Sequence, residues 1–372
     1  MQTERLKIMN TYKSALEYAK MCCDTIMRKF HAKELPPKGR FHYHAGVFLS
    51  GMERCFLLNG MEKYNEYIKA FIDEFVDNNG KLNNANLEKL DDMQPCNLMF
   101  RYCNRDDRYN KVLDSVVPRL LTWKTNKYGG FWHMGDTPDQ MWLDSLYMGG
   151  PLAVRYGLSR GKREYIELIH KQMELMFKNM RNKKTGLLYH AWDCSKKELW
   201  ANHENGCSGF FWGRAIGWVI VATADIAEYL GDDVLARSFM DRAVELTMAV
   251  LKYQDPKSNL WFQVVDKGDD PDNWTETSCS CLFLYGLCKL IRMGAIDNKY
   301  IERAEKAFHG IIKEKTYEEN GNFIVKDICI GTGVGDYKHY IERPTVENDL
   351  HGTGAFTLMC TEYEKMQRKW KK

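Results

Sequence analysis

The sequence predicts an all-α protein, an (α/α)6 barrel of six helical hairpins in which residues 1–372 form a single domain. Twelve segments carry apolar residues three and four positions apart, the spacing of one helix face. Stretches such as AIGWVIVATADIA and SCSCLFLYGLCKLI are apolar almost all round and must be buried, whereas the segments between them are charged on one side. Because this alternation recurs six times, we expect six inner helices inside six outer ones. An open solenoid of helical pairs is the alternative, but its repeats are usually more regular.

The first five helices are delimited by residues that cap or stop a helix. A Pro-Pro pair follows the first, and asparagine with glycine follows the second and the third. Asp91 and Asp92 cap the fourth, with Pro95 in its first turn, and Pro118 kinks or ends the fifth. The expected ranges are 4–30, 43–58, 62–76, about 91–103 and 107–121.

The sixth helix is expected to open at the start signal TPDQ, residues 137–140, and to continue with a bend through the sequence GGP. Met141, Asp144 and Met148 then share one helix face. A carboxylate held against apolar groups has a raised pKa, so Asp144 is a candidate general acid. The alternative is an N-terminal helix carboxylate that backbone N–H groups and the helix dipole satisfy.

The remaining helices are separated by loops rich in polar and aromatic residues, with a longer insert before the twelfth. In the predicted barrel the even-numbered helices are the inner ones and run the same way, so their N-termini meet at one mouth. The positive dipole ends of six helices favour an anionic ligand there. Aromatic side chains in the loops suit the faces of sugar rings. Together these features predict a sugar that bears a carboxylate. The expected ranges are 162–180, 208–230, 233–253, 276–292, 299–313 and 350–368.

Composition excludes several other classes of protein. The formal charge of +3 gives no reason to expect nucleic acid or an anionic membrane as partner, and no obligate protein partner is evident. No apolar secretory segment begins the chain, and its least charged run is too short to span a bilayer. Twelve cysteines without a CxxC pair indicate reduced thiols in a cytoplasmic protein. His42 and His44 have no nearby cysteine pair, so no metal site is expected.

Arg214 and Trp218 lie four residues apart on the eighth helix and so face the same way. The planar fork of an arginine binds a carboxylate with two parallel hydrogen bonds, which suits a uronate. The alternative is an arginine paired with a structural carboxylate such as Asp193 or Glu204.

Five segments distributed along the chain resemble one enzyme family, the unsaturated rhamnogalacturonyl hydrolases of glycoside hydrolase family 105, akin to the unsaturated glucuronyl hydrolases of family 88. The likeness covers nearly the whole chain, and the pair QMWLD and FWGRAxGW is specific. The segments are LDDMQP at 90–95, DQMWLDSLYMGGP at 139–151, YHAWD at 189–193, CSGFFWGRAIGW at 207–218 and RPTVENDLHGTGAF at 343–356.

The resemblance implies an (α/α)6 barrel that removes the 4,5-unsaturated uronic acid from the non-reducing end of oligosaccharides made by a lyase, most closely the unsaturated rhamnogalacturonan disaccharide. An aspartic acid protonates C4 while water adds at C5, and the resulting hemiketal opens and releases the neighbouring sugar. The motif match gives this role to Asp144, as acid and then base. It gives a helper role to Asp91. The adjacent Asp92 is the alternative, because the motif can be aligned with either aspartate. This chemistry requires no metal or organic cofactor.

The resemblance also implies a set of residues around the sugar. His190, Trp212, Arg214 and Trp218 match positions that line it, His133 and Met148 lie near them, and Tyr43 and His351 are expected at the same mouth.

Four alternative functions remain open. They are an unsaturated glucuronyl hydrolase acting on glycosaminoglycan or arabinogalactan fragments, a conventional inverting glycosidase with carboxylates roughly 6.5 to 9.5 Å apart, a sugar epimerase that uses histidines, and a helical scaffold that binds proteins. A scaffold predicts a charged or apolar concave face, not tryptophans, aspartates and an arginine gathered at one set of helix ends.

Overall fold

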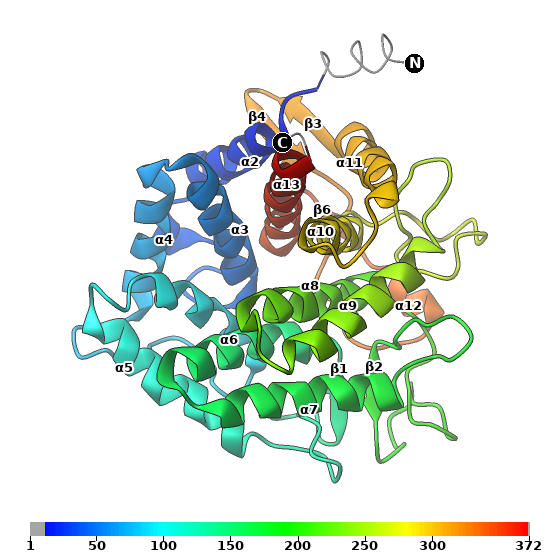
Figure 1. Ribbon diagram of the computed structural model, residues 1–372, viewed down its shortest axis with the longest axis horizontal. Coiled ribbons are helices and arrows are strands. Elements are labelled where there is room, and N and C mark those ends of the chain that lie inside the picture. The colour runs from blue at the N-terminus through cyan, green and yellow to red at the C-terminus, as the bar shows by residue number, and fades with distance from the viewer. Residues whose placement is uncertain (1–11, 371–372) are drawn as a thin grey trace.

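The computed structural model describes residues 12–370, and its helices form two concentric rings (Figure 1). The ring closes because the last inner helix packs against the first. This confirms the predicted all-α (α/α)6 barrel. The inner ring consists of α3 (Tyr43–Asn59), the 3-10 helix η3 (Gln94–Arg101), α6 (Asp144–Arg160), α8 (Gly213–Leu230), α10 (Thr277–Met293) and α13 (Leu350–Trp370). The outer ring consists of α2 (Ala15–Lys29), α4 (Glu62–Phe75), α5 (Asp107–Val116), α7 (Arg163–Asn179), α9 (Ala236–Leu251) and α11 (Ile301–Lys315).

Burial follows the pattern of the sequence. Nearly every side chain of α8 and α10 is buried, whereas α4 buries only one face, with Tyr64, Ile68 and Phe71 turned inward. Because outer helices cover each inner helix on its far side, the inner helices can be apolar all round. The helix expected from residue 4 begins at a capping box of Ser14 and Glu17, and residues 4–11 of that expectation lie outside the described part of the chain.

The fourth and fifth predicted helices differ from expectation in their geometry. The fourth consists of two 3-10 helices, η2 (Leu90–Asp92) and η3, rather than one α-helix. The fifth ends as α5 at Val116 and continues as the 3-10 helix η4 (Val117–Thr122), which begins beside Pro118. Proline offers no backbone N–H, so a change of helix type at this point is expected.

The predicted start of the sixth helix is wrong. Thr137 closes a local turn, in which its hydroxyl bonds the backbone of Met134, and Asp139 adopts the left-handed φ of 63°. Residues Gln140–Trp142 form strand β1, which pairs antiparallel with β2 (Ala191–Asp193). The helix begins only at Asp144 and is continuous through Pro151.

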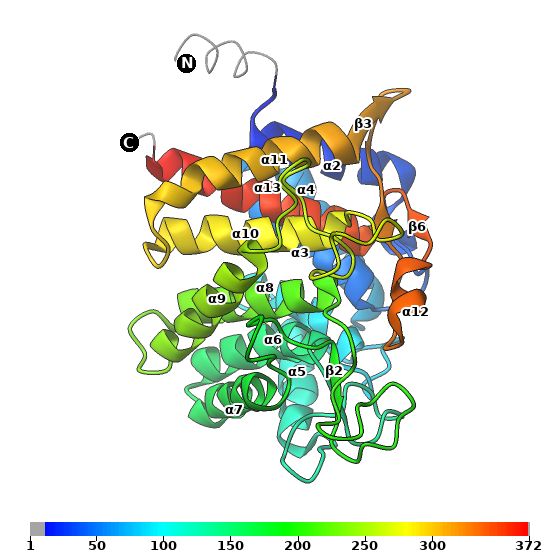
Figure 2. The same ribbon diagram turned by 90° about the vertical axis from the view of Figure 1, so that its right-hand side faces the viewer.

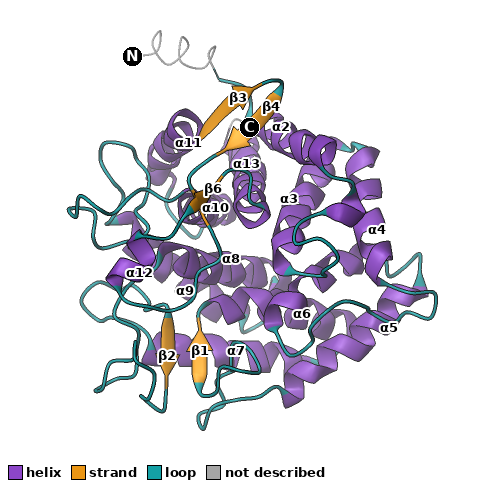
Figure 3. Cartoon of the chain, turned by 180° about the vertical axis from the view of Figure 1, so that it is seen from behind, coloured by secondary structure: helices purple, strands orange, loops and turns teal. Residues whose placement is uncertain are grey.

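Short strands and loops gather at the N-terminal ends of the inner helices, on one side of the barrel (Figures 2 and 3). They include β1, β2 and the pair β5 (Ile328–Cys329) and β6 (Thr345–Val346), together with α12 (Tyr337–Ile341). The hairpin of β3 (Thr316–Glu319) and β4 (Asn322–Val325) follows α11, and short 3-10 turns occur at η1 (Ala32–Glu34) and η5 (Asn298–Tyr300). Among residues 12–370, no helix is both long and apolar enough to cross a membrane.

Candidate functional site

The mouth formed by the inner-helix N-termini holds a cavity of about 280 Å³. Side chains from four inner helices or the loops before them meet there, together with a loop of the insert before α13. We call it the mouth cavity. Its lining residues are His42, Tyr43, His44, Asp91, His133, Met134, Trp142, Asp144, Met148, Trp212, Arg214, Gly331, Thr332 and Gly333.

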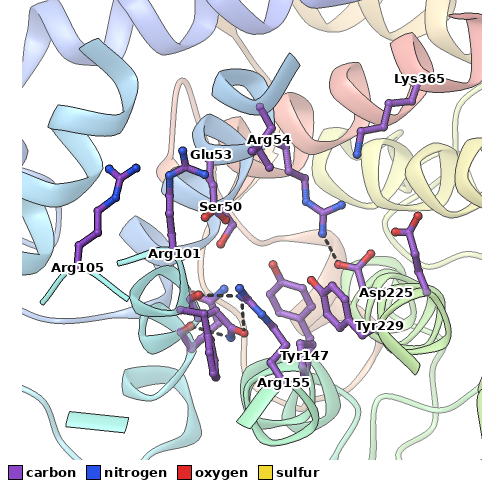
Figure 4. A pocket seen from close by; sticks show the side chains of 16 residues that line it. Ser50, Glu53, Arg54, Arg101, Arg105, Tyr147, Arg155, Asp225, Tyr229 and Lys365 are labelled. Atoms are coloured by element: carbon purple, nitrogen blue, oxygen red, sulfur yellow. Dashed lines mark hydrogen bonds and ion pairs between the residues drawn. The ribbon is translucent and has the colours of Figure 1, made fainter. Parts of the chain in front are cut away.

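A larger cavity of about 520 Å³ lies at the other end of the barrel, between the C-terminal halves of inner helices (Figure 4). Arg54 contacts Asp225 there, and Lys289 lies 2.5 Å from Asp225 and 2.6 Å from Glu228. Acting against the effect of burial, Arg54 and Lys289 hold the pKa of Asp225 below the usual range, and Lys289 and Arg292 do the same for Glu228. The two carboxyls that the sequence singles out, Asp91 and Asp144, line the mouth cavity and not this one, so the mouth cavity is the better candidate for catalysis.

Two carboxyl groups, Asp91 from η2 and Asp144 from the start of α6, face the mouth cavity. Burial, followed by the charges of Asp144 and Asp92, raises the pKa of Asp91 to about 7. Asp92, by contrast, is almost fully buried, accepts the backbone N–H of Asn86 at 2.6 Å and does not line the cavity. Of the two residues that could match the helper aspartate of the family motif, Asp91 and Asp92, the structure therefore brings Asp91 into the cavity beside Asp144.

The expectation that apolar flanks raise the pKa of Asp144 is wrong. Burial acts in that direction, but the hydrogen bond and charge of His190, with the charges of His133 and Arg214, outweigh it and lower the pKa of Asp144. Met141 lies on β1 rather than on the helix, so Asp144 does not sit between two methionines on one helix face. A place at the N-terminal end of α6 also favours the ionised carboxylate.

His190 is fully buried behind Asp144, with its Nε2 atom 3.3 Å from Asp144 Oδ2. Its Nδ1 atom lies 2.9 Å from the hydroxyl of Tyr340, which in turn accepts the backbone N–H of Gly335. Because that N–H uses the oxygen of Tyr340 as an acceptor, the phenol hydrogen is available for His190 Nδ1. The proton of a neutral His190 then lies on Nε2 and points towards Asp144.

One wall of the mouth cavity is aromatic. The rings of His133 and Trp142 are stacked, with centroids 4.6 Å apart. His133 Nδ1 lies 3.0 Å from the hydroxyl of Ser145, and Nε2 lies 3.9 Å from Asp91. Burial lowers the pKa of His133 to about 4, so this ring is neutral at neutral pH. Trp142 is partly exposed and offers a flat apolar face to a ligand.

Arg214 is only 1% exposed and does not pair with Asp193 or Glu204. Nη1 donates to the carbonyl of Cys329 at 2.6 Å and Nη2 to that of Ile330 at 2.7 Å. The guanidinium therefore holds the segment that leads into the cavity loop at 331–333, and it lies over the ring of Trp212. Its charge faces the cavity, but much of its hydrogen-bonding capacity is used by the protein itself.

The predicted site residues fall into two groups. Seven line the mouth cavity, whereas His190, Trp218 and His351 do not: His190 lies behind Asp144, Trp218 stacks on Tyr147 of the larger cavity, and His351 is fully buried. The seven are Tyr43, Asp91, His133, Asp144, Met148, Trp212 and Arg214.

Sequence reasoning missed several lining residues. Trp142 lies inside the QMWLD segment and could have been found from it, whereas the loop at 331–333 carries no reactive side chain that would mark it. At the wall of the cavity, His44, Asp349 and His351 come together in a group with the character of metal ligands.

Comparison with known proteins gives a family and a fold. The model described as Glycosyl Hydrolase Family 88 matches residues 18–367. A solved glycoside hydrolase of family 105 from C. acetobutylicum ATCC 824 is 32% identical, with a TM-score of 0.88 over 93% of this chain and 99% of that one. The unsaturated rhamnogalacturonyl hydrolase YesR of Bacillus subtilis is 29% identical over 53% of this chain and 52% of its own length.

A third similar protein is the unsaturated glucuronyl hydrolase of Bacillus sp. GL1. It shares the fold, with a TM-score of 0.71 over 93% of this chain and 95% of that one, at 15% identity.

Proposed function

Because the chain belongs to the glycoside hydrolases of families 88 and 105, we propose that it releases a 4,5-unsaturated uronic acid from the non-reducing end of a lyase-generated oligosaccharide. The observation that carries this proposal is the pair Asp91 and Asp144, a half-buried and a buried carboxyl with opposite pKa shifts on a cavity with an aromatic wall. Groups whose environments push their pKa values apart are suited to acid and base roles. Residues 1–372 act as one catalytic domain in this proposal, since the cavity draws on helices from α3 to α8 and on the insert before α13.

The reaction adds the elements of water across the C4=C5 double bond. A proton from the carboxyl pair is added to C4, the oxygen of water bonds to C5, and a carboxylate of the pair takes the proton that this water releases. The hemiketal at C5 then opens, and the hemiacetal left at C1 expels the neighbouring sugar. The protein is regenerated with one proton on the pair, as at the start.

Asp91 holds this proton in the free protein, because its pKa is about 7 while Asp144 is ionised. The family resemblance gives the donor role to Asp144. The two assignments are compatible if the proton moves when substrate binds. A uronate carboxylate next to Asp144 would raise its pKa by like-charge repulsion, and the donor role would then pass to Asp144.

Binding of the uronate relies on the charge of Arg214, the helix N-termini and the wall of His133 and Trp142. For the sugar next to it we propose rhamnose, as in an unsaturated rhamnogalacturonan disaccharide. The name of the similar Bacillus subtilis enzyme supports this choice. Fragments of glycosaminoglycans or of arabinogalactan side chains are the alternative substrates.

The decisive experiment follows the ultraviolet absorbance of the enol ether while the protein acts on lyase digests of rhamnogalacturonan, arabinogalactan side chains and glycosaminoglycans. We expect the absorbance to disappear fastest with the rhamnogalacturonan disaccharide, as free rhamnose appears. In D2O, one deuterium should be found at C4 of the released acid by NMR. A saturated disaccharide of the same sugars is the control. Cleavage of the saturated sugar alone would overturn the hydration mechanism and favour a conventional glycosidase.

A further inference from the structure

Three potential metal ligands meet at the wall of the mouth cavity, although they come from opposite ends of the chain. His44 lies in the first turn of α3, and Asp349 and His351 flank the start of α13. Asp349 Oδ1 lies 3.4 Å from His44 Nδ1 and 3.0 Å from His351 Nδ1. The two imidazole rings are 4.7 Å apart between centroids. Within the described residues, this is the group of histidine and carboxylate side chains that could hold a metal ion.

The hydrogen bond of His351 fixes which nitrogen carries its proton. His351 Nε2 lies 3.0 Å from the backbone carbonyl of Cys329, and a carbonyl can only accept, so Nε2 must donate. The lone pair of a neutral His351 is therefore on Nδ1. This atom has no hydrogen-bond partner in the described structure, and the side chain is fully buried.

The neighbour of that lone pair is itself an acceptor. Asp349 Oδ1, a carboxylate oxygen, lies 3.0 Å from His351 Nδ1. Two acceptors at this separation repel each other unless a cation lies between them. The arrangement also resembles the usual support of a metal-bound histidine, whose second ring nitrogen donates to a backbone carbonyl.

The two separations from Asp349 fit a small divalent ion, and all three ligand atoms lie within 4.8 Å of one another. Nitrogen and oxygen ligands about 2.0 to 2.2 Å from a tetrahedral zinc ion lie about 3.4 Å from one another. The observed separations from Asp349 Oδ1 are 3.0 and 3.4 Å. Two histidines and one carboxylate also leave coordination positions open, which suits zinc, cobalt or iron as divalent ions.

An ion bound here would be accessible from the mouth cavity. His44 lines that cavity, and the side chains of His44 and Asp349 keep 21% and 17% of their exposure. The Cys329 carbonyl that orients His351 also accepts from Arg214 at 2.6 Å. The group therefore lies directly beside the arginine that faces the cavity.

We propose that His44, Asp349 and His351 form a binding site for one divalent transition-metal ion, with zinc as the preferred ion, at the wall of the mouth cavity. The remaining positions on the ion are taken by water or by an oxygen of a ligand in the cavity. This inference does not depend on the proposed reaction, since metal binding is measured without a substrate.

The test uses full-length protein without an affinity tag, stripped with a chelator and then titrated with Co²⁺ alone. We expect one equivalent to bind, with visible absorption bands of a nitrogen-ligated site, and Zn²⁺ to displace it. Mass spectrometry of protein purified without chelator should find close to one transition-metal ion per chain. Asp349→Asn and His351→Gln should each weaken Co²⁺ binding by about 100-fold or more, because each removes one ligand.

Two further variants serve as matched controls. His203→Gln alters an exposed histidine away from the group, and His42→Asn alters the neighbour of His44 while keeping a side chain that can cap α3. Both should bind Co²⁺ like the parent. If the parent binds no ion, or if Asp349→Asn and His351→Gln bind as tightly as the controls, the inference is wrong. Should one variant fail to fold, the parent titration and the other variant still decide.

Discussion

Asp91 and Asp144 hold their protons differently because only Asp144 has a buried histidine close behind it that favours its ionised form. Asp144 faces His190 at 3.3 Å, whereas the nearest cation-forming group to Asp91 is the neutral His133 at 3.9 Å. Burial therefore dominates at Asp91 and the partners dominate at Asp144. At neutral pH the cavity contains one ionised carboxylate and one carboxyl near its midpoint.

This division predicts the pH dependence of activity. The value of kcat/KM reports the ionisation of the free protein, so it should fall as the pH rises above about 7, where Asp91 loses its proton. The acid limb should lie below the usual range of an aspartate, since the pKa of Asp144 is lowered. Initial rates from pH 3 to 10 on an unsaturated disaccharide measure both limbs. A value of kcat/KM that stays constant from pH 6 to 9 would contradict the role of Asp91.

The same shift predicts how stability changes with pH. The pKa of Asp91 is raised in the folded protein, so its contribution to stability is complete below the unfolded pKa and is lost as the pH rises towards about 7. The slope is at most about 1.4 kcal/mol per pH unit. Asp91→Asn does not titrate, so the free energy of unfolding of the parent should fall relative to this variant between pH 4 and 7. Urea unfolding at several pH values measures the difference, and parallel curves would contradict the shift.

Asp144→Asn tests the second carboxyl. The substitution keeps the size of the side chain but removes a carboxyl that transfers protons as acid and then base, so we expect kcat to fall by roughly 10² to 10⁴-fold. Circular dichroism and the melting temperature should match the parent, because no backbone hydrogen bond depends on this carboxylate among those that the structure shows. Asp136→Asn, at an exposed position of the preceding loop, is the control. Activity within a few fold of the parent would remove Asp144 from the mechanism.

At the scale of single elements, the segment before α6 shows what local signals can and cannot predict. The residues TPDQ form a good start signal for a helix, yet they close a turn that leads into β1. β1 exists because Ala191–Asp193 lies beside it, a partner about fifty residues away whose pairing no local pattern reveals. The start of the helix was predicted wrongly, but the placement of Asp144 near the N-terminus of an inner helix was correct. Periodicity and family resemblance agreed on that placement.

Arg214 anchors the segment that leads into the loop at 331–333. It holds the carbonyls of Cys329 and Ile330, while Glu276 at the cap of α10 accepts the N–H of Cys329 at 3.0 Å. Arg214→Ala should therefore loosen the loop at 331–333, raise KM at least tenfold and lower the melting temperature. Arg214→Lys keeps the charge but loses the planar fork. Compared with Arg214→Ala, its KM should therefore lie closer to that of the parent, while its melting temperature should stay nearly as low. If both variants matched the parent in melting temperature, the arginine would serve only the ligand.

For the whole molecule, the ring of helices could be predicted because inner and outer helices differ in composition, which one sequence displays. The metal-ligand group and the larger cavity could not, because their members are far apart in the chain. His44 on α3 and Asp349 just before α13 lie side by side only because the barrel closes. Lys289 and Asp225 appear in the sequence as isolated charges within apolar helices, and only the folded ring shows that they meet.

That buried charge network links four inner helices and predicts a stability effect far from the mouth cavity. Lys289 on α10 is fully buried and contacts Asp225 and Glu228 on α8, while Arg54 on α3 contacts Asp225 and lies 4.0 Å from Glu362 on α13. Lys289→Met fills the same space but removes one cation from each carboxylate, so that Asp225 keeps only Arg54 and Glu228 keeps only Arg292 among the described pairs. Breaking a buried pair in this way costs about 3 to 5 kcal/mol.

We therefore expect Lys289→Met to lower the free energy of unfolding by about this amount in urea, while kcat at a temperature well below the melting point stays within a few fold of the parent. Lys306→Met is the matched control, because its pair with Glu302 is exposed and such pairs contribute about 0 to 1 kcal/mol. A loss for Lys289→Met no larger than that of the control would mean that Arg54 alone neutralises Asp225.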